Sequence, residues 1–266
     1  MNTIKIQCPA KINLGLKVVN RRSDGFHNID SIMQTISLYD YLTISVDISE
    51  STVIKLSGTS DEIPYDENNL VYKAVAKYLE VTKISAMVSV YIEKNIPVAA
   101  GLAGGSTDAA GVLFGLNVIF NNKLSNSQLH DICAGLGSDL NFCLKGGRVK
   151  TSSRGEILED TDFVPFNVNL IKPVGLGISA KEAYTSFSEK NKPELQNERA
   201  NFVNDLEWAV IDNYQQLQHI KSVYPTSIMT GSGPTYFSID EKFKPELGYW
   251  VKNDLKAIDF GVKICD

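Results

Sequence analysis

One stretch, residues 97–113, constrains what this chain can fold into more than any other. It contains three glycines, then a Ser-Thr-Asp triplet at 106–108, then an apolar run with helical spacing that includes a fourth glycine at 111. Glycines let backbone N–H groups approach a ligand closely, because no Cβ stands in the way. We expect the triplet to cap a helix over residues 108–120, whose free N–H groups and dipole favour an anion. The stretch therefore fits a phosphate cradle, but it also fits a turn with small residues for close helix packing.

The segment before the glycines favours the phosphate cradle. Residues 87–94 alternate as a strand and lead directly into the loop, so that the order is strand, glycine loop, helix. A phosphate-binding loop requires that context. No Gly-Lys-Ser/Thr sequence closes the loop, which excludes a Walker A motif. The GxGxxG spacing is missing as well, which disfavours a dinucleotide-binding fold.

The composition is that of an ordinary globular protein. Its 266 residues suit one large domain or two smaller ones, with 43% hydrophobic and 21% charged residues. The net charge of -5 argues against general nucleic-acid binding, so any phosphate site must be local. No apolar run is long enough for a membrane helix, and the N-terminus lacks a signal-peptide pattern. We therefore expect a cytoplasmic protein that binds neither nucleic acid nor membrane.

The four cysteines, Cys8, Cys133, Cys143 and Cys265, are scattered along the chain without a CxxC pair. Zinc sites in proteins usually show closely paired ligands, and only three histidines are present to join these cysteines. We expect buried free thiols and no structural metal.

The hydrophobic patterns predict an α+β chain. In the N-terminal half we expect strands over 4–7, 9–19, 29–46 (two strands around 39–41) and 53–56, and helices over 69–79 and 125–136. In the C-terminal third we expect strands over 166–172, 227–239 (strand, glycine turn, strand) and 260–264, and helices over 181–187, 204–210, 214–223 and 247–255. That second pattern indicates helices on an antiparallel sheet.

Two polar sites stand close to predicted strand and helix ends. Lys11 and Asn13 share one face of the strand after Pro9, either as a solvated face or as part of a site. Asp139 stands just past the predicted helix 125–136, where a carboxylate is usually a helix cap. On their own, these residues leave both interpretations open.

Phe26 and His27 close a polar, turn-rich segment at 21–27. An aromatic ring beside an imidazole is suited to stacking on a flat heterocycle and hydrogen bonding to it. The pair is equally suited to an ordinary packed loop with a solvated imidazole.

Three separated segments, 9–14, 97–113 and 229–234, together resemble the three motifs of the GHMP kinases, in their order and spacing. The resemblance spans nearly the whole chain. Four further segments resemble the branch of that family that phosphorylates a cytidylated methylerythritol in non-mevalonate isoprenoid biosynthesis: 21–27, 137–139, 154–156 and 204–207.

The resemblance implies a fold and a division into domains. We expect an α+β, two-layer GHMP kinase fold, with a ribosomal S5 domain 2-like N-terminal domain and a ferredoxin-like C-terminal domain. Residues 1–156 would bind ATP, residues 157–266 would form the second domain, and the substrate would lie in the cleft between them. The resemblance is to enzymes that act on a small molecule, and we expect a monomer or a weak homodimer.

The resemblance also implies a reaction, the ATP- and Mg²⁺-dependent phosphorylation of the 2-hydroxyl of the methylerythritol. Asp139 would be the general base and Lys11 its cationic partner, which fits a reaction that needs a positioned proton acceptor and charge neutralisation. Mg²⁺ would accompany ATP near Ser106, without a metal site built by the protein. The positions that match nucleotide contacts are Asn69, Leu70, Lys94, Pro97, Ala99, Ala100, Gly101, Leu102, Ala103, Gly104, Gly105, Ser106 and Thr107. Those that match substrate contacts are Asn13, Phe26, His27, Ser179, Tyr184, Gly231 and Ser232.

This chain departs from the family pattern at a few positions. Asn141 stands where proline is frequent, and Ala103 and Thr107 stand where glycine and serine are frequent. Ala180 replaces a common substrate-side threonine, which would shift that contact onto Ser179.

Three other functions share parts of this pattern. A sister kinase acting on mevalonate-type or homoserine-type alcohols would share the three motifs, but the Phe26–His27 pair argues for a cytidine-bearing substrate. A non-catalytic sugar or nucleotide sensor on the same scaffold would not need both Lys11 and Asp139. An RNA-binding protein that shares the N-terminal topology is disfavoured by the isoelectric point of about 5.3.

Overall fold

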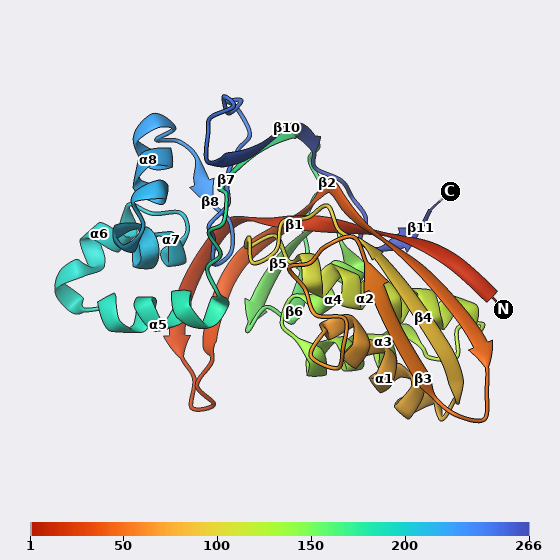
Figure 1. The fold of residues 1–266 in the computed structure, drawn as a ribbon. Coiled ribbons are helices and arrows are strands. Elements are labelled where there is room, and N and C mark those ends of the chain that lie inside the picture. The colour runs from red at the N-terminus through yellow and green to blue at the C-terminus, as the bar shows by residue number, and fades with distance from the viewer. Residues whose placement is uncertain (1, 266) are drawn as a thin grey trace.

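The computed structural model describes residues 2–265, which form two sheets with helices packed against them (Figure 1). The larger sheet has the order β11-β1-β2-β4-β3, and β5 and β6 extend it beside β2. Its strands are β1 (Asn2–Arg21), β2 (His27–Ile48), β3 (Val53–Gly58), β4 (Ala86–Glu93), β5 (Arg148–Ser153), β6 (Ile157–Asp160) and β11 (Lys263–Ile264). Pairing within it is antiparallel except between β3 and β4.

Four helices cover one face of the larger sheet (Figure 1). They are α1 (Leu70–Thr82), α2 (Gly104–Ile119), α3 (Asn126–Leu136) and α4 (Leu140–Lys145). Helix α2 lies directly on the strands, because a Cβ at Gly111 or Gly115 would overlap Cys8 or Ile44. The glycines and alanines of this helix therefore do serve close packing, in addition to any role of the loop that precedes it.

The smaller, antiparallel sheet has the order β10-β7-β9-β8 and carries its own helices. Its strands are β7 (Asn167–Pro173), β8 (Ile228–Met229), β9 (Tyr236–Ser238) and β10 (Tyr249–Lys256). The helices are α5 (Ala180–Lys190), α6 (Gln196–Ala200), α7 (Asp205–Val210) and α8 (Gln215–Val223), with 3-10 turns at Pro193–Leu195 and Ile211–Asn213. They enclose a second core that contains the fully buried Trp208.

The long hairpin of β1 and β2 connects the two halves of the molecule (Figure 1). Asp205 at the start of α7 is completely buried, and its Oδ2 accepts a hydrogen bond of 2.7 Å from the backbone N–H of Val18. The same carboxylate pairs with Lys17 and Arg199. A buried carboxylate with this many donors fixes the end of the hairpin against α7, so residues of β1 and β2 face both halves.

Several predicted helices are confirmed, and side chains cap their N-termini. The side chain of Asn69 caps α1, and Ser125 caps α3 in a capping box with Gln128. Helix α5 begins after Ser179, whose hydroxyl accepts from the N–H of Glu182. The α+β class holds for both halves, and Cys8, Cys133 and Cys143 are buried thiols, as expected.

Five predictions of local structure are wrong. The helix after the glycine loop begins at Gly104 and not at residue 108, and its N-cap is Ala103 in the left-handed region, with no side-chain cap. The triplet 106–108 therefore lies within the helix. Residues 247–255 are not a helix: β10 covers most of them, because backbone pairing with β7 overrides the local helical spacing.

The other three errors concern breaks within strands and the extent of the last strand. Pro9 does not break the first strand, because β1 shifts register between Pro9 and Ala10 and so continues without a proline N–H. Likewise β2 runs unbroken through residues 39–41, and the last strand is limited to Lys263–Ile264.

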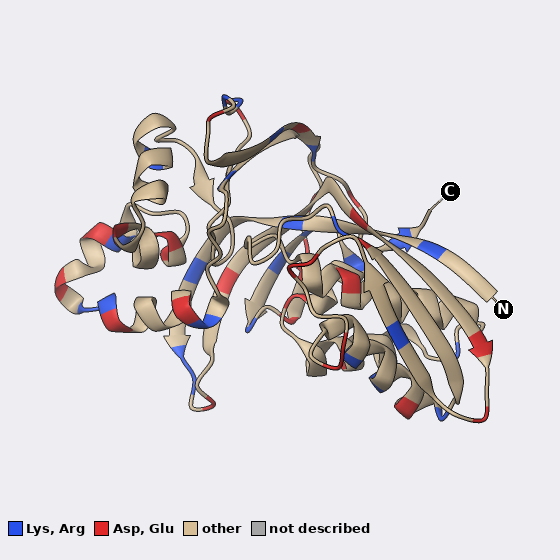
Figure 2. Ribbon diagram, viewed as in Figure 1, with Lys and Arg blue, Asp and Glu red and all other residues tan. Residues whose placement is uncertain are grey.

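The division between residues 156 and 157 stays a prediction. In the larger sheet β6 pairs with β5 and β11 pairs with β1, so residues 157–160 and 263–264 add strands to the sheet of the N-terminal half. Acidic and basic residues are interspersed over both halves (Figure 2). Among residues 2–265, no helix is long and apolar enough to cross a membrane.

Candidate active site

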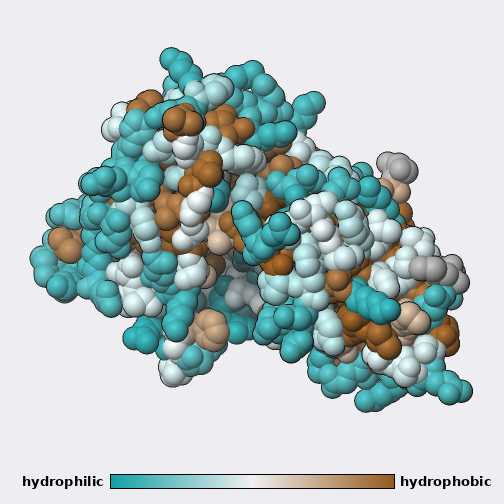
Figure 3. All heavy atoms as spheres, in the orientation of Figure 1, coloured by the Kyte–Doolittle hydropathy of each residue, from teal (hydrophilic) through white to brown (hydrophobic). Residues whose placement is uncertain are grey.

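A cavity of about 1170 Å³ opens between the β1–β2 hairpin, the glycine loop and α5. In the space-filling view the surface is hollowed near the middle, between the two halves (Figure 3). All the site residues predicted from the sequence line this cavity except Leu102 and Thr107, which are buried in the protein. The predicted nucleotide and substrate positions thus belong to one continuous space.

One end of the cavity is formed by two glycine loops. The backbone of Gly101 (φ +73°) approaches the segment 230–233 so closely that a Cβ there would lie 3.0 Å from the Gly233 nitrogen. Beyond it, α2 begins at Gly104, and a Cβ at Gly105 would meet nothing within 4 Å. The first N–H groups of a helix have no intrahelical partner, so those of Gly104, Gly105 and Ser106 are oriented for an anion.

The ammonium of Lys11 lies between these loops and Asp139, the predicted general base. Its Nζ donates to Asn13 Oδ1 at 2.6 Å and to the Gly101 carbonyl at 2.9 Å. It also lies 3.9 Å from Asp139 Oδ2, and a Cβ at Gly231 would be 3.0 Å away. The Lys11 side chain is only 4% exposed. The three segments that resemble family motifs therefore meet at one buried cation.

Asp139 occupies the N-cap position of α4, but its side chain makes no capping hydrogen bond. Its backbone is helical (φ -89°, ψ -12°), and the carboxylate is 30% exposed beside Lys11. The interpretation of this carboxylate as a helix cap is therefore wrong. An acceptor that faces both a cation and an open cavity is placed to receive a proton from a bound hydroxyl.

Asn13 is held in a single orientation. Its Oδ1 accepts from Lys11, its Nδ2 donates to Ser31 Oγ at 2.8 Å, and its backbone N–H donates to Thr230 Oγ1 at 2.9 Å. Ser31 in turn donates to the Gly15 carbonyl at 2.6 Å. Thr230 lies in the segment 229–234 that resembles a family motif. No sequence pattern indicated Ser31, because the pairing of β1 with β2 alone brings it to Asn13.

At the other end of the cavity, aromatic rings gather between the hairpin and α5. His27 stacks on Tyr184 with ring centroids 5.0 Å apart and an angle of 14° between the planes. Phe26 is 53% exposed, and the guanidinium of Arg154 lies over its ring at 5.0 Å. Burial, together with the positive charge of Arg21, holds the pKa of His27 below its usual value. The arrangement provides flat surfaces and a neutral imidazole for a heterocycle.

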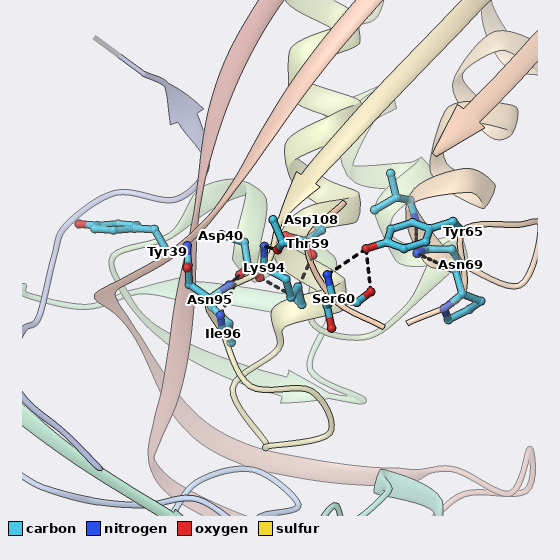
Figure 4. A network of polar contacts seen from close by, with 12 residues as sticks. Tyr39, Asp40, Thr59, Ser60, Tyr65, Asn69, Lys94, Asn95, Ile96 and Asp108 are labelled. Carbon is cyan, nitrogen blue, oxygen red and sulfur yellow. Dashed lines mark hydrogen bonds and ion pairs between the residues drawn. The ribbon is translucent and has the colours of Figure 1, made fainter. Parts of the chain in front are cut away.

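The ammonium of Lys94 is held between two buried carboxylates beneath the glycine loop (Figure 4). It forms ion pairs with Asp40 and with Asp108, the latter at 2.9 Å, and all three side chains are at most 5% exposed. Burial alone lowers the pKa of the Lys94 ammonium, but the two carboxylates outweigh burial and raise it. Lys94 therefore connects the two carboxylates beneath the loop, and because it also lines the cavity its contact with a nucleotide stays a prediction.

Asp40 extends this network to the strand that leads into the loop. Its Oδ1 accepts from the backbone N–H groups of Asn95 and Ile96 at 2.6 and 2.8 Å (Figure 4). Asp108, the fifth residue of α2, pairs with the same ammonium. The two carboxylates thus hold both ends of the glycine loop. The sequence could not predict this network, because Asp40, Lys94 and Asp108 follow no recognisable spacing along the chain.

The comparisons with known proteins agree with this geometry. The family described as GHMP kinases N terminal domain matches residues 69–147. The chain is 38% identical to the 4-diphosphocytidyl-2-C-methyl-D-erythritol kinase of Clostridioides difficile (strain 630), over 90% of this chain and 87% of the relative. It is also 38% identical to the enzyme of that name from Clostridium beijerinckii, over 92% and 94% of the two chains.

Solved structures are similar over nearly the whole chain. A crystal structure of 4-(cytidine 5'-diphospho)-2C-methyl-D-erythritol kinase aligns with a TM-score of 0.74 and 26% identity, and covers 96% of this chain and 99% of that one. A homoserine kinase from Cytophaga hutchinsonii aligns with a TM-score of 0.70 but only 16% identity, which supports the fold alone. The chain therefore belongs to the GHMP kinases, in the family of the 4-diphosphocytidyl-2-C-methyl-D-erythritol kinases, and is a phosphotransferase with an alcohol group as acceptor.

Proposed function

We propose that this enzyme transfers the γ-phosphoryl group of ATP to the 2-hydroxyl of 4-diphosphocytidyl-2-C-methyl-D-erythritol, a step of non-mevalonate isoprenoid biosynthesis. The observation that carries the proposal is the contact between Lys11 and Asp139 at the junction of the two glycine loops. Aromatic rings suited to a nucleobase line the same cavity at its other end. The substrate in the names of the relatives would fill both ends of the cavity, because its erythritol part carries a hydroxyl and its cytidine part carries a cytosine base.

The reaction needs a proton acceptor and a field that tolerates negative charge. Asp139 takes the proton of the substrate hydroxyl as its oxygen bonds to the γ-phosphorus, and the bond to the β–γ bridging oxygen breaks to leave ADP. Lys11 offsets the charge that develops around the attacking oxygen, and the N–H groups at the start of α2 bind the phosphates. In this proposal residues 1–156 bind ATP, and residues 157–266 complete the substrate cleft.

Mg²⁺ fits the oxygen donors of this cavity as a companion of ATP. Among residues 2–265 no group of three His, Cys, Asp or Glu side chains could hold a metal ion by itself. The Ser106 hydroxyl and the Asp139 carboxylate line the cavity beside the glycine loop, and Mg²⁺ is commonly held by one or two protein oxygens together with substrate phosphates. When bound, the ion supplies further neutralisation of phosphate charge.

A coupled ADP-release assay tests the proposed substrate. We expect turnover with 4-diphosphocytidyl-2-C-methyl-D-erythritol and ATP in the presence of Mg²⁺, and little turnover with mevalonate or homoserine. Omission of Mg²⁺ should remove most of the activity. Preference for one of the simple alcohols would assign the chain to a different reaction of the same fold, and no ATP consumption with any alcohol would contradict a catalytic role.

A further inference from the structure

Ser188, in the last turn of α5, connects the histidine of the cavity to the helix behind it. Its Oγ lies 3.0 Å from Nε2 of His27 and 3.0 Å from the backbone carbonyl oxygen of Tyr184. Ser188 and His27 both line the cavity. The family resemblance gave no role to this serine, and it lies more than 160 residues from the histidine that it contacts.

The two contacts fix the direction of each hydrogen bond. A hydroxyl has one hydrogen, and a carbonyl oxygen can only accept, so the Ser188 hydrogen is directed to Tyr184. Towards His27 the Ser188 oxygen therefore accepts, and the Nε2 atom must carry the donated hydrogen. A neutral imidazole has one N–H, which leaves Nδ1 with a free lone pair.

The surroundings of His27 favour the neutral ring and leave Nδ1 open. Burial and Arg21 of β1 both lower the pKa of the imidazole. The other charged or titratable side chains with which α5 and the β5–β6 turn line the cavity are Lys181, Tyr184 and Glu189 of α5 and Arg154 of the turn. Tyr184 covers one face of the ring and Phe187 meets it at 86°, with centroids 6.1 Å apart. Within residues 2–265 no hydrogen-bond partner is found for Nδ1.

We propose that Ser188 is a positioning residue that fixes the Nε2–H tautomer of His27, so that Nδ1 accepts a hydrogen bond from an exocyclic amino group of the base. Cytosine presents an amino donor at the position where uracil presents a carbonyl acceptor. A uracil oxygen facing Nδ1 would place two lone pairs against each other and leave both without a donor, which weakens binding of the uridine analogue. Ser188 thus makes the cavity select cytosine over uracil. This inference rests on the proposed function, because it assumes that a pyrimidine nucleotide occupies the aromatic end.

The tautomer is measured directly by ¹⁵N NMR of the imidazole nitrogens, without substrate. The chain has only three histidines, so His27 is assigned from the spectrum of a His27→Gln variant. We expect the proton of neutral His27 on Nε2 in the wild type. In Ser188→Ala we expect a mixture of both tautomers, and in Ser188→Thr, which keeps a hydroxyl able to donate to the carbonyl four residues earlier, we expect the wild-type spectrum.

Selectivity is measured as the ratio of kcat/KM for the cytidylated substrate to that for its uridine counterpart. We expect Ser188→Ala to lower this ratio by about threefold to tenfold, the effect of one hydrogen bond, with the kcat for the cytidylated substrate little changed. Ser188→Thr should restore the ratio. Ser222→Ala is the matched control, because Ser222 is an exposed helical serine that also donates to a backbone carbonyl but lies on α8, away from the cavity.

Different outcomes separate this inference from the proposed function. A wild-type spectrum with the proton on Nδ1, or an unchanged selectivity ratio in Ser188→Ala, would overturn the inference while kinase activity stands. A wild type that phosphorylates neither pyrimidine substrate would refute the proposed function. In that case the NMR comparison of Ser188→Ala with wild type still decides whether Ser188 sets the tautomer.

Discussion

The two ends of the cavity are built in different ways. At the phosphate end, Lys11, Lys94, Asp40 and Asp108 are nearly fully buried, and most of their polar atoms have partners within the protein. At the aromatic end, Phe26 and Ser188 are exposed and His27 is only partly buried, with a single side-chain hydrogen bond. A buried network with many donors holds its geometry before any ligand arrives, whereas exposed rings gain theirs from the ligand. In the proposed function, phosphoryl transfer and base selection therefore depend on different kinds of contact, which mutations can separate.

The largest expected effect is at the phosphate end. We predict that Asp139→Ala lowers kcat by about a hundredfold or more, because the substrate hydroxyl loses its proton acceptor. The side chain makes no capping bond, so the fold should be little affected. Steady-state kinetics with saturating ATP measures the change, and circular dichroism controls for folding. Near-normal turnover in a folded variant would contradict the role of Asp139 as base.

The buried ammonium of the phosphate end gives the second prediction. Lys94→Met leaves two buried carboxylates without their cation, and we expect a loss of about 3 kcal/mol or more in the free energy of unfolding. Urea denaturation at neutral pH measures it. The control is Lys77→Met, which removes an exposed pair with Glu80 on α1 and should cost about 0.5 kcal/mol or less. Similar losses in both variants would mean that the network does not hold the loop.

The site residues that could be predicted from the sequence differ in kind from those that could not. The glycines, Lys11 and Asp139 were found because their motifs are local, and each is a short run with a known chemical use. Asp40 and Ser31 were not found, because their partners are assigned by strand pairing and not by spacing along the chain. The cap of α2 was predicted wrongly for a related reason: Ala103 adopts the left-handed region at φ 59°, a conformation that glycine or asparagine would have indicated but alanine does not.

In the C-terminal half, strand pairing likewise overrides a structure predicted from local spacing. Residues 247–255 have a helical spacing of apolar side chains, yet β10 pairs with β7 through a register shift between Lys252 and Leu255. Asp254 takes a positive φ of 62° at that shift. A bulge of this kind breaks the strict alternation by which a strand is recognised, so the pattern pointed to the wrong structure.

At the aromatic end, we expect a substitution of His27 to have a smaller effect, and on KM instead of kcat. We predict that His27→Ala raises KM for the cytidylated substrate by about tenfold, with kcat changed by about twofold at most, because the ring binds the base and lies away from the reacting oxygen. The matched control is His219→Ala, an exposed histidine of α8 that pairs with Glu246. If kcat falls as far as in Asp139→Ala, the two ends of the cavity are not independent.

The smallest effect is a pH dependence confined to the aromatic end. Because burial and Arg21 hold the pKa of His27 below its usual value, the ring is neutral at neutral pH and gains a proton only on acidification below its ordinary titration range. Protonation turns Nδ1 from an acceptor into a donor, which opposes the amino group of cytosine, so KM for the substrate should rise as the pH falls through this depressed pKa. Arg21→Gln removes a positive charge from the ring's surroundings and should move this rise to a higher pH by a fraction of a unit, while kcat at saturating substrate keeps its own profile. A KM profile of His27→Gln that keeps the acid limb would assign the titration to another group, since that variant has no imidazole at this position to protonate.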